Sequence, residues 1–345
     1  WEESIDRTDT LVRLADHGEL DSKAIVEKIK NAGVVGMGGA TFPSHVKLTP
    51  PPGCKAECVI INAVECEPYL TADHRLMLEH ADEILEGVEI IMKAVSVEKG
   101  YIGIENNKPD AIALMTDRAK AHPHIEVVPL KVKYPQGGEK QLIDAIIGRQ
   151  VPAPPAIPIQ VGAVVQNVGT AFAIYQAVLK NKPLLDRVVT VTGKSVARPG
   201  NLLARLGTPL QQLMDECGGL PEDAGKIISG GPMMGKALLS LEVPVTKGSS
   251  GLLVMSEKEA RRTEPSPCIR CAKCVGVCPM GLEPYLLATL SAHGKWEEAE
   301  RNEVTSCIEC GSCQYTCPSH RPLLDMVRVG KSTVMGIIKA RAAKK

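Results

Sequence analysis

CIRCAKCVGVCP, from Cys268 to Pro279, places four cysteines with two, two and three residues between them and ends in proline. The same pattern returns as CIECGSCQYTCP, from Cys307 to Pro318. Cysteine runs of this spacing hold [4Fe–4S] clusters in bacterial ferredoxins. Two copies in one chain therefore predict a ferredoxin-like domain that carries two clusters and transfers single electrons.

The last cysteine of each run bears on how the ligands are shared. Three closely spaced sulfurs reach three corners of one cubane, but the fourth cannot easily close the same cluster. In two-cluster ferredoxins this fourth cysteine ligates the other cluster. We therefore expect crossed ligand sets: Cys268, Cys271, Cys274 and Cys317 for cluster 1, and Cys307, Cys310, Cys313 and Cys278 for cluster 2.

Disulfides and zinc are the two other interpretations of these cysteines. Disulfides fit poorly, because nothing at the N-terminus resembles a secretory signal and the chain is not a small stapled scaffold. Zinc sites typically use paired CxxC units, and the longer repeated run is more specific for iron–sulfur clusters. Four further cysteines lack cluster spacing and are predicted to be free thiols: Cys54, Cys58, Cys66 and Cys217.

Composition narrows the class of protein. The chain has 345 residues, which is room for about two or three domains. Lys+Arg and Asp+Glu both number 40, so the formal net charge is +0, and only 3% of the residues are aromatic. We therefore expect no nucleic-acid partner, because such binding needs basic surfaces or aromatic stacking platforms. Free thiols and clusters indicate a reducing, cytosolic setting.

No segment of the sequence predicts a transmembrane helix. The most apolar stretch, residues 161–179, is broken by Gln166, Asn167 and Gly169, whereas a spanning helix needs about 20 mainly apolar residues. Any membrane attachment would then depend on partner proteins. The chain begins at Trp1 rather than at methionine, so we expect that an N-terminal segment is missing.

Residues 59–189 alternate short apolar runs with helical periodicity. Strands that alternate with helices favour an α/β layer with a largely parallel sheet. The proline-rich segment 151–158 is interpreted as a loop of this same domain. We expect strands at 59–61, 101–104, 125–132 and 164–165, and helices over 84–95, from 109, over 140–147 and from 170.

The pattern changes near Arg187. The β-branched residues 188–191 predict a strand and residues 208–217 a helix, which together indicate a small strand-helix-strand module that ends near Met255. The charged segment 256–264 is expected to be a linker. The stretch between the two cysteine runs is longer than a minimal ferredoxin needs, so we expect a helical ferredoxin domain.

The C-terminal tail from Lys331 is basic and has no acidic residue. A basic helix can favour an anionic membrane surface or an acidic partner. A solvated terminal helix is the favoured interpretation.

A glycine-rich segment, GVVGMGGATFP, occupies Gly33–Pro43. Glycines allow the backbone to approach a phosphate or a flat ring closely, and free N–H groups bind anions. The segment matches neither the Rossmann fingerprint nor the P-loop. On spacing alone, a plain turn is an equally good interpretation.

Polar residues follow the predicted strand 59–61. Glu65 and Glu67 lie in the acidic segment 62–68, and two further polar turns, 137–139 and 167–170, occupy strand-to-helix junctions. The carboxyl ends of parallel strands form a common ligand-binding edge, so we expect these three segments and the glycine-rich segment 33–43 to converge there. A carboxylate in this position can accept hydrogen bonds from a ribose, although a solvated loop with a helix-capping acid is the alternative.

At these segments the sequence resembles the NADH/FMN-binding subunit of respiratory complex I. Over nearly the whole chain, with both cysteine runs and GGPMMG at 230–235, it more closely resembles the RnfC family, whose members belong to the Rnf complex. The resemblance to complex I is carried by GMGGATFPSHVKL (36–48), NAVECEPYLTADH (62–74), YPQGGEKQLI (134–143) and QNVGT (166–170).

The resemblance implies the fold, the cofactors and their site residues. It implies a Rossmann-like α/β domain that binds FMN and NAD(H), a small β-grasp module of the SLBB type, and a helical domain with two [4Fe–4S] clusters. Gly36, Gly38 and Gly39 would cradle the flavin. Phe42 would lie beside the nicotinamide dinucleotide, and Glu67 and Glu139 near its ribose or carboxamide. Further cofactor contacts are expected from Lys47, Asn62, Glu65, Gly137, Asn167 and Thr170.

Four positions depart from the complex I pattern. Val64 stands where that family has an aspartate, Met37 where it has an arginine, and Gly138 and Gly169 where it has glutamates. The nucleotide contacts are therefore less firmly implied than the flavin-binding fold. The resemblance to the RnfC family also implies a further N-terminal domain, which we do not expect within these 345 residues.

The function implied by the resemblance is electron transfer between NAD(H), FMN and two clusters. It would operate at the cytoplasmic face of the cell membrane with other Rnf subunits, coupled to Na+ or H+ transport and, through the complex, to ferredoxin. Two alternatives are a soluble flavin and iron–sulfur cobalamin reductase and a non-catalytic electron-relay and docking subunit. The expected domains are 1–186 for FMN and NAD(H), 187–255 for β-grasp, 256–330 for the clusters and 331–345 for the tail.

Overall fold

The computed structural model describes residue 18 and residues 20–343. Expectations about Trp1, and about the last two residues of the basic tail, lie outside this range. The chain forms two compact units. One contains the described residues up to Val151 together with Ile157–Glu259, and the other contains Pro152–Ala156 and the described residues from Ala260.

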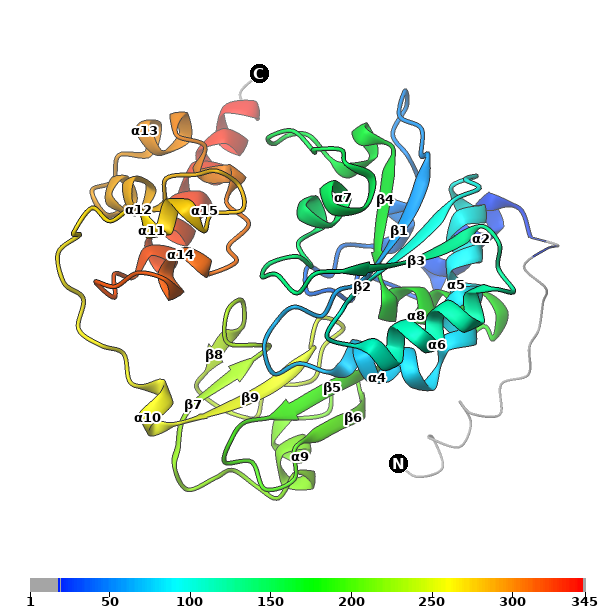
Figure 1. Ribbon diagram of the computed structural model, residues 1–345, viewed down its shortest axis with the longest axis horizontal. Helices are drawn as coiled ribbons and strands as arrows, with labels where there is room; N and C mark the ends of the chain where they lie inside the picture. The colour runs from blue at the N-terminus through cyan, green and yellow to red at the C-terminus, as the bar shows by residue number, and fades with distance from the viewer. Residues whose placement is uncertain (1–17, 19, 344–345) are drawn as a thin grey trace. The chain divides into compact units, whose positions relative to one another are not determined.

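The first unit contains a four-stranded parallel sheet in the order β3-β2-β1-β4 (Figure 1). Parallel strands need crossover connections, and helices supply most of them here. The predicted α/β fold is confirmed. Its elements are α2 (Ser22–Asn31), α3 (Ser44–Lys47), β1 (Cys58–Ala63), α4 (Ala72–Glu79), α5 (Ala81–Ala94), β2 (Gly100–Glu105), α6 (Pro109–Ala119), β3 (Ile125–Leu130), α7 (Glu139–Ile147), the 3-10 turn η2 (Pro158–Val161), β4 (Ala163–Asn167) and α8 (Val168–Leu179).

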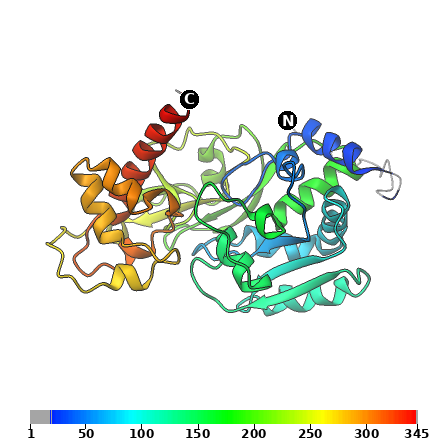
Figure 2. The ribbon, with the colours of Figure 1, turned by 90° about the horizontal axis from the view of Figure 1, so that it is seen from above.

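Helices cover both faces of this sheet, as Figure 2 also shows. Successive side chains of a strand point to opposite faces. Val59 and Ile61 of β1 accordingly join the core formed with α5 and α8, whereas Ile60 joins the core formed with α7. Burial on both faces explains why this strand is an unbroken apolar run rather than an alternating one.

Helices α5 and α8 approach each other closely at Gly87. A Cβ atom built on Gly87 would lie 2.1 Å from the carbonyl oxygen of Ala171 in α8. No side-chain rotation can relieve this contact, because the neighbouring atom belongs to the backbone. The crossing of the two helices therefore requires glycine at this position.

The first unit also contains a five-stranded mixed sheet in the order β6-β5-β9-β7-β8. Val189 and Val191 of β5 pack with Leu213 and Met214 of α9 in its core. The sequence predicted only one of these strands explicitly, together with the helix. The elements are β5 (Asp186–Thr192), β6 (Gly200–Arg205), α9 (Leu210–Glu216), β7 (Ala224–Ser229), β8 (Lys236–Leu238) and β9 (Gly251–Ser256), followed by α10 (Glu257–Ala260).

The described part of the second unit is helical, as expected for the cluster domain. Helix α15 continues through residue 331, where the sequence suggested the start of a separate tail, and its Val334 is fully buried. Among the described residues, no helix combines the length and apolar character needed to cross a bilayer. The elements are α11 (Lys273–Gly276), α12 (Pro284–Ala292), α13 (Trp296–Arg301), the 3-10 turn η3 (Val304–Ser306), α14 (Ser312–Tyr315) and α15 (Leu323–Ala342).

Gly87→Ala is expected to destabilise the first unit by about 1–3 kcal/mol, because the added methyl group forces α5 and α8 apart. Urea unfolding followed by circular dichroism measures the change. The control is Gly336→Ala in α15, where the added Cβ meets no atom within 4 Å. This control should stabilise its helix by roughly 0.5–1 kcal/mol. An unchanged unfolding midpoint for Gly87→Ala would contradict the close crossing.

Candidate functional site

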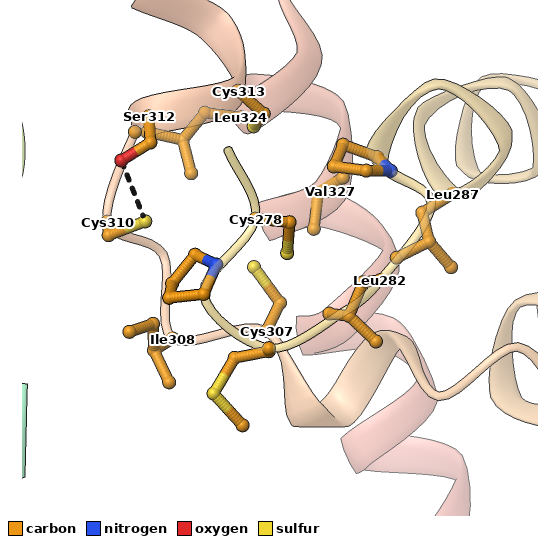
Figure 3. A pocket seen from close by; sticks show the side chains of 14 residues that line it. Cys278, Leu282, Leu287, Cys307, Ile308, Cys310, Ser312, Cys313, Leu324 and Val327 are labelled. Atoms are coloured by element: carbon orange, nitrogen blue, oxygen red, sulfur yellow. Dashed lines mark hydrogen bonds between the residues drawn. The ribbon is translucent and has the colours of Figure 1, made fainter. Parts of the chain in front are cut away.

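The eight cysteines of the two runs line two separate hollows in the second unit. Each hollow takes three cysteines from one run and the last cysteine of the other. One is lined by Cys278 together with Cys307, Cys310 and Cys313 (Figure 3). The other is lined by Cys317 together with Cys268, Cys271 and Cys274. This grouping is the one that the crossed assignment predicts, while ligation itself remains a prediction.

The Cys278 hollow is apolar. Leu282, Leu287, Leu324 and Val327 surround the thiols. Burial among them, with Cys307 and Cys310 close by, raises the pKa of Cys313 to about 12. A cluster is held by thiolates rather than thiols, so its binding would release protons from this site.

The Cys317 hollow is open to solvent at one side. Cys268 and Cys271 are exposed, whereas Cys274 is buried. In the described part of the chain, no three histidine, cysteine or acidic side chains converge at the spacing of a single metal ion. A cubane instead spreads its thiolates over separate irons, so its ligands line a hollow rather than meet at one point.

The glycine-rich segment forms a loop beside the carboxyl ends of β1 and β4. Its base is closed by the Gly36 N–H, which donates to the Phe42 carbonyl oxygen at 2.8 Å. Gly38 and Gly39 at the tip are exposed, and Gly39 adopts a φ of +108° with open space where a Cβ would stand. Phe42 is exposed as well. The tip can therefore accept a flat group against bare backbone.

Two residues of the β4–α8 junction make hydrogen bonds at this edge of the sheet, one to the glycine loop and one to α4. The hydroxyl of Thr170 is buried and accepts from the Met37 N–H at 2.9 Å. The side chain of Asn167 caps α8 through the Gly169 N–H at 2.9 Å and donates to the Asp73 carboxylate at 2.7 Å. The sequence prediction that these segments converge is therefore seen in their contacts.

Asn62 and Gly137 meet on the neighbouring side of the same edge. The Asn62 amide donates to the Gly137 carbonyl oxygen at 2.8 Å. The Gly137 N–H lies 3.4 Å from the Cys66 sulfur, and a Cβ on Gly137 would stand 2.5 Å from the Val64 carbonyl oxygen. Glycine at this position lets the two loops lie in contact.

Lys47 and Glu139 form an ion pair. The Lys47 ammonium group is 2.5 Å from the Glu139 carboxylate and also donates to the Val165 carbonyl oxygen at 2.8 Å. The resemblance assigned these side chains to flavin and nucleotide respectively. In the structure they contact each other, and about a third of each side chain remains exposed.

Glu65 caps a helix. Its carboxylate accepts from the N–H groups of Asp73 and His74, at 3.0 and 3.1 Å, in the first turn of α4. Burial, with the nearby charge of Asp73, raises the pKa of Glu65 to about 7. The helix-capping interpretation, given as the alternative from sequence, describes these contacts.

Glu67 joins the acidic loop to the β-grasp module. One carboxylate oxygen accepts from the N–H groups of Met233 and Met234, at 2.6 and 3.1 Å, and the other from the Tyr134 hydroxyl at 3.3 Å. A Cβ on Gly231 would lie 2.1 Å from the Glu67 side chain. Both oxygens therefore have protein partners.

Two charged residues at the site were not singled out from the sequence: Arg187, which is buried, and Asp73, which is half-buried. The Arg187 guanidinium donates to the carbonyl oxygens of Met37 and Ser249, at 3.2 and 3.1 Å. Burial raises the pKa of Asp73, and the Asn167 hydrogen bond and the Arg187 charge oppose the rise. Their only sequence signal was position, Arg187 at the change of pattern and Asp73 after the acidic segment.

The chain matches three family descriptions in the order of its domains. Residues 29–176 match the Nuo51 FMN-binding domain, residues 188–237 the SLBB domain and residues 260–318 the 4Fe-4S dicluster domain. The exposed glycine tip and the two cysteine-lined hollows fit the cofactors that these descriptions name.

A solved structure also shares the fold. The NAD+-reducing [NiFe]-hydrogenase in its H2-reduced state aligns with a TM-score of 0.64 and 19% identity, covering 96% of this chain and 66% of that chain.

Curated relatives show the family. The RnfC protein of the Na(+)-translocating ferredoxin:NAD(+) oxidoreductase complex of Acetobacterium woodii is 47% identical over 92% of this chain and 71% of its own length. The corresponding proteins of the proton-translocating complex of Clostridium ljungdahlii and of the ion-translocating complex of Rhodobacter capsulatus are 51% and 44% identical. Those matches cover 79% and 76% of this chain, which spans only 59% and 51% of the two relatives. The chain thus belongs to the RnfC family, found in the ion-translocating ferredoxin:NAD(+) oxidoreductase complexes.

Proposed function

We propose that this chain is the NAD(H)-binding flavin and iron–sulfur subunit of a membrane-bound ferredoxin:NAD+ oxidoreductase complex that translocates Na+ or H+. The observation that carries the proposal is the combination, in one chain, of an exposed glycine tip at the edge of the flavin-type sheet and two crossed cysteine sets. A flavin, when bound, exchanges two electrons with NAD(H) and single electrons with clusters.

The residues of this chain supply binding and orientation. Thr170 and Arg187 fix the Met37 backbone from both sides, so the glycine tip keeps its shape before a ligand arrives. Such preorganisation lowers the free-energy cost of binding. The Lys47 ammonium group would lie near the flavin. The Glu139 carboxylate balances the positive charge of Lys47 and would also contact the nucleotide.

The remaining assignments belong to this proposal. Gly36, Gly38, Gly39, Asn62 and Asn167 would contact FMN, and Phe42 the nicotinamide. We assign Glu65 and Glu67 to shaping the acidic loop, since their oxygens already accept hydrogen bonds. The complex would hold the chain at the cytoplasmic face of the membrane through other Rnf subunits. The predicted domain boundaries stay predictions: the FMN and NAD(H) domain ends at residue 186, the β-grasp module at residue 255 and the cluster domain at residue 330.

Cys317→Ser should remove the cluster of the first cysteine run, and Cys278→Ser that of the second. Total iron should fall from about eight to about four per chain in each variant. Iron assay and electron paramagnetic resonance of the reduced, anaerobically purified chain check this. Cys317→Ser should lose the same signal as Cys271→Ser, and Cys278→Ser the same signal as Cys310→Ser.

The control for these variants is Cys54→Ser, which lies outside both runs and should keep full iron. If Cys317→Ser instead matched Cys310→Ser, each run would ligate its own cluster. Zinc in place of iron would overturn the proposed function itself.

Glu139→Gln is expected to raise the KM for NADH roughly tenfold, because the variant loses the carboxylate that also pairs with Lys47. Steady-state reduction of an artificial acceptor measures KM, and absorbance measures flavin content. Glu126→Gln, at an exposed position of β3, should leave both unchanged. Unaltered NADH affinity and turnover in Glu139→Gln would remove Glu139 from the nucleotide site.

Glu65 should make the first unit less stable as pH rises. Its folded-state pKa of about 7 lies above the ordinary value of 4.5. Its contribution to stability is therefore fully present below pH 4.5 and is lost as pH rises through about 7. Urea midpoints between pH 5 and pH 8 should fall less steeply for Glu65→Gln than for the parent chain. Glu126→Gln serves as the control, and equal slopes for Glu65→Gln and the parent would contradict the assignment.

A further inference from the structure

The two cysteine hollows differ in exposure. The Cys317 hollow, which holds three cysteines of the first run, is called the first hollow, and the Cys278 hollow is called the second. Cys268 and Cys271 of the first hollow are exposed. In the second hollow Cys310 is buried, and Cys278, Cys307 and Cys313 are half-buried. Because electron tunnelling weakens steeply with distance, the cluster whose ligands reach the surface is the better one for exchange with another protein.

Charge also distinguishes the hollows. Arg270 and Arg321 line the first hollow, and no acidic side chain does. Arg270 is exposed and has no ion-pair partner among the described residues. Beside the second hollow, Glu309 pairs with Arg328 at 3.1 Å and with Lys331 at 2.9 Å. The side chains that line the first hollow therefore include two positive charges and no acidic group, whereas the positive charges beside the second hollow are paired with Glu309.

The rim of the first hollow has the residue types of a protein interface. Ile269 is 68% exposed and Tyr285 is 37% exposed, and both line the hollow with the two arginines. Arginine and tyrosine are enriched at the centres of interfaces. Exposed aliphatic surface next to two arginine side chains favours a partner with acidic and apolar residues rather than a small anion.

We infer that the rim formed by Ile269, Arg270, Tyr285 and Arg321 is the docking surface for an acidic electron-carrier protein. This carrier exchanges single electrons with the cluster of the first hollow. This inference rests on the proposed function, because it requires that cluster. One electron passes between this cluster and the redox group of the carrier, so one is oxidised as the other is reduced.

Arg270→Gln and Arg321→Gln test the docking surface. The probe is an acidic two-cluster ferredoxin in its oxidised form, and binding to the oxidised, fully loaded chain is followed by calorimetry. Each substitution should weaken binding about two- to fivefold. The double variant should also reduce the dependence of Kd on NaCl concentration, because fewer charges are paired across the interface. Arg301→Gln removes one exposed positive charge elsewhere in the unit and should leave Kd unchanged.

Three outcomes would overturn the docking surface. The first is an unchanged Kd and salt dependence in the double variant with full iron content. The second is equal weakening by Arg301→Gln. The third is a lower midpoint potential of the cluster at unchanged Kd, which would assign the arginines to the cluster alone. If a substitution lowers the iron content, Ile269→Ser with full iron provides the test, and unaltered binding in that variant overturns the surface.

The same preparations separate this inference from the proposed function. Reduction of bound flavin by NADH should be equal in all of these variants. Absence of that reduction in the parent chain would count against the proposed function. Its presence together with unaltered probe binding would count against the docking surface only.

Discussion

Arg187 is the buried charge on which the first unit depends. Its guanidinium holds the carbonyl oxygen of Met37, in the glycine loop, and that of Ser249, which precedes β9. The residue is only 6% exposed and interacts with the charge of Asp73. Removing this guanidinium would leave buried carbonyl oxygens without their hydrogen-bond partner, at a cost of about 1–3 kcal/mol. The shape of the cofactor edge and the seating of the β-grasp sheet thus rely on the same side chain.

Sequence patterns were sufficient for much of the fold. The apolar run Val59–Ile61 predicted a strand, and the structure places its residues alternately in two cores. The repeated cysteine spacing predicted which four cysteines would line each hollow. Such features follow from local spacing, since period and motif are properties of a short segment. The five-stranded sheet was only partly predicted, because its strands pair over long distances in sequence.

The site was less predictable than the fold. The polar residues of the sheet edge were found, but their partners were not. Glu67 accepts from backbone groups 166 and 167 residues away, and Lys47 pairs with Glu139 across 92 residues. Nothing in the residue types Glu or Lys reveals such pairings, because a carboxylate suits a ribose, a helix N-terminus and a backbone turn equally well. Only the tertiary arrangement distinguishes these roles.

The crossed cysteine sets have a consequence for the folding of the second unit. In the proposed assignment each cluster joins residues on both sides of α12 and α13, so each closes a long loop of chain. Closing a loop removes conformational freedom mainly from the unfolded chain, as a disulfide does. Neither loop can be closed by one cysteine run alone. The iron–sulfur groups would therefore act as two interlocked staples, and this unit would acquire its full rigidity only after both had been inserted.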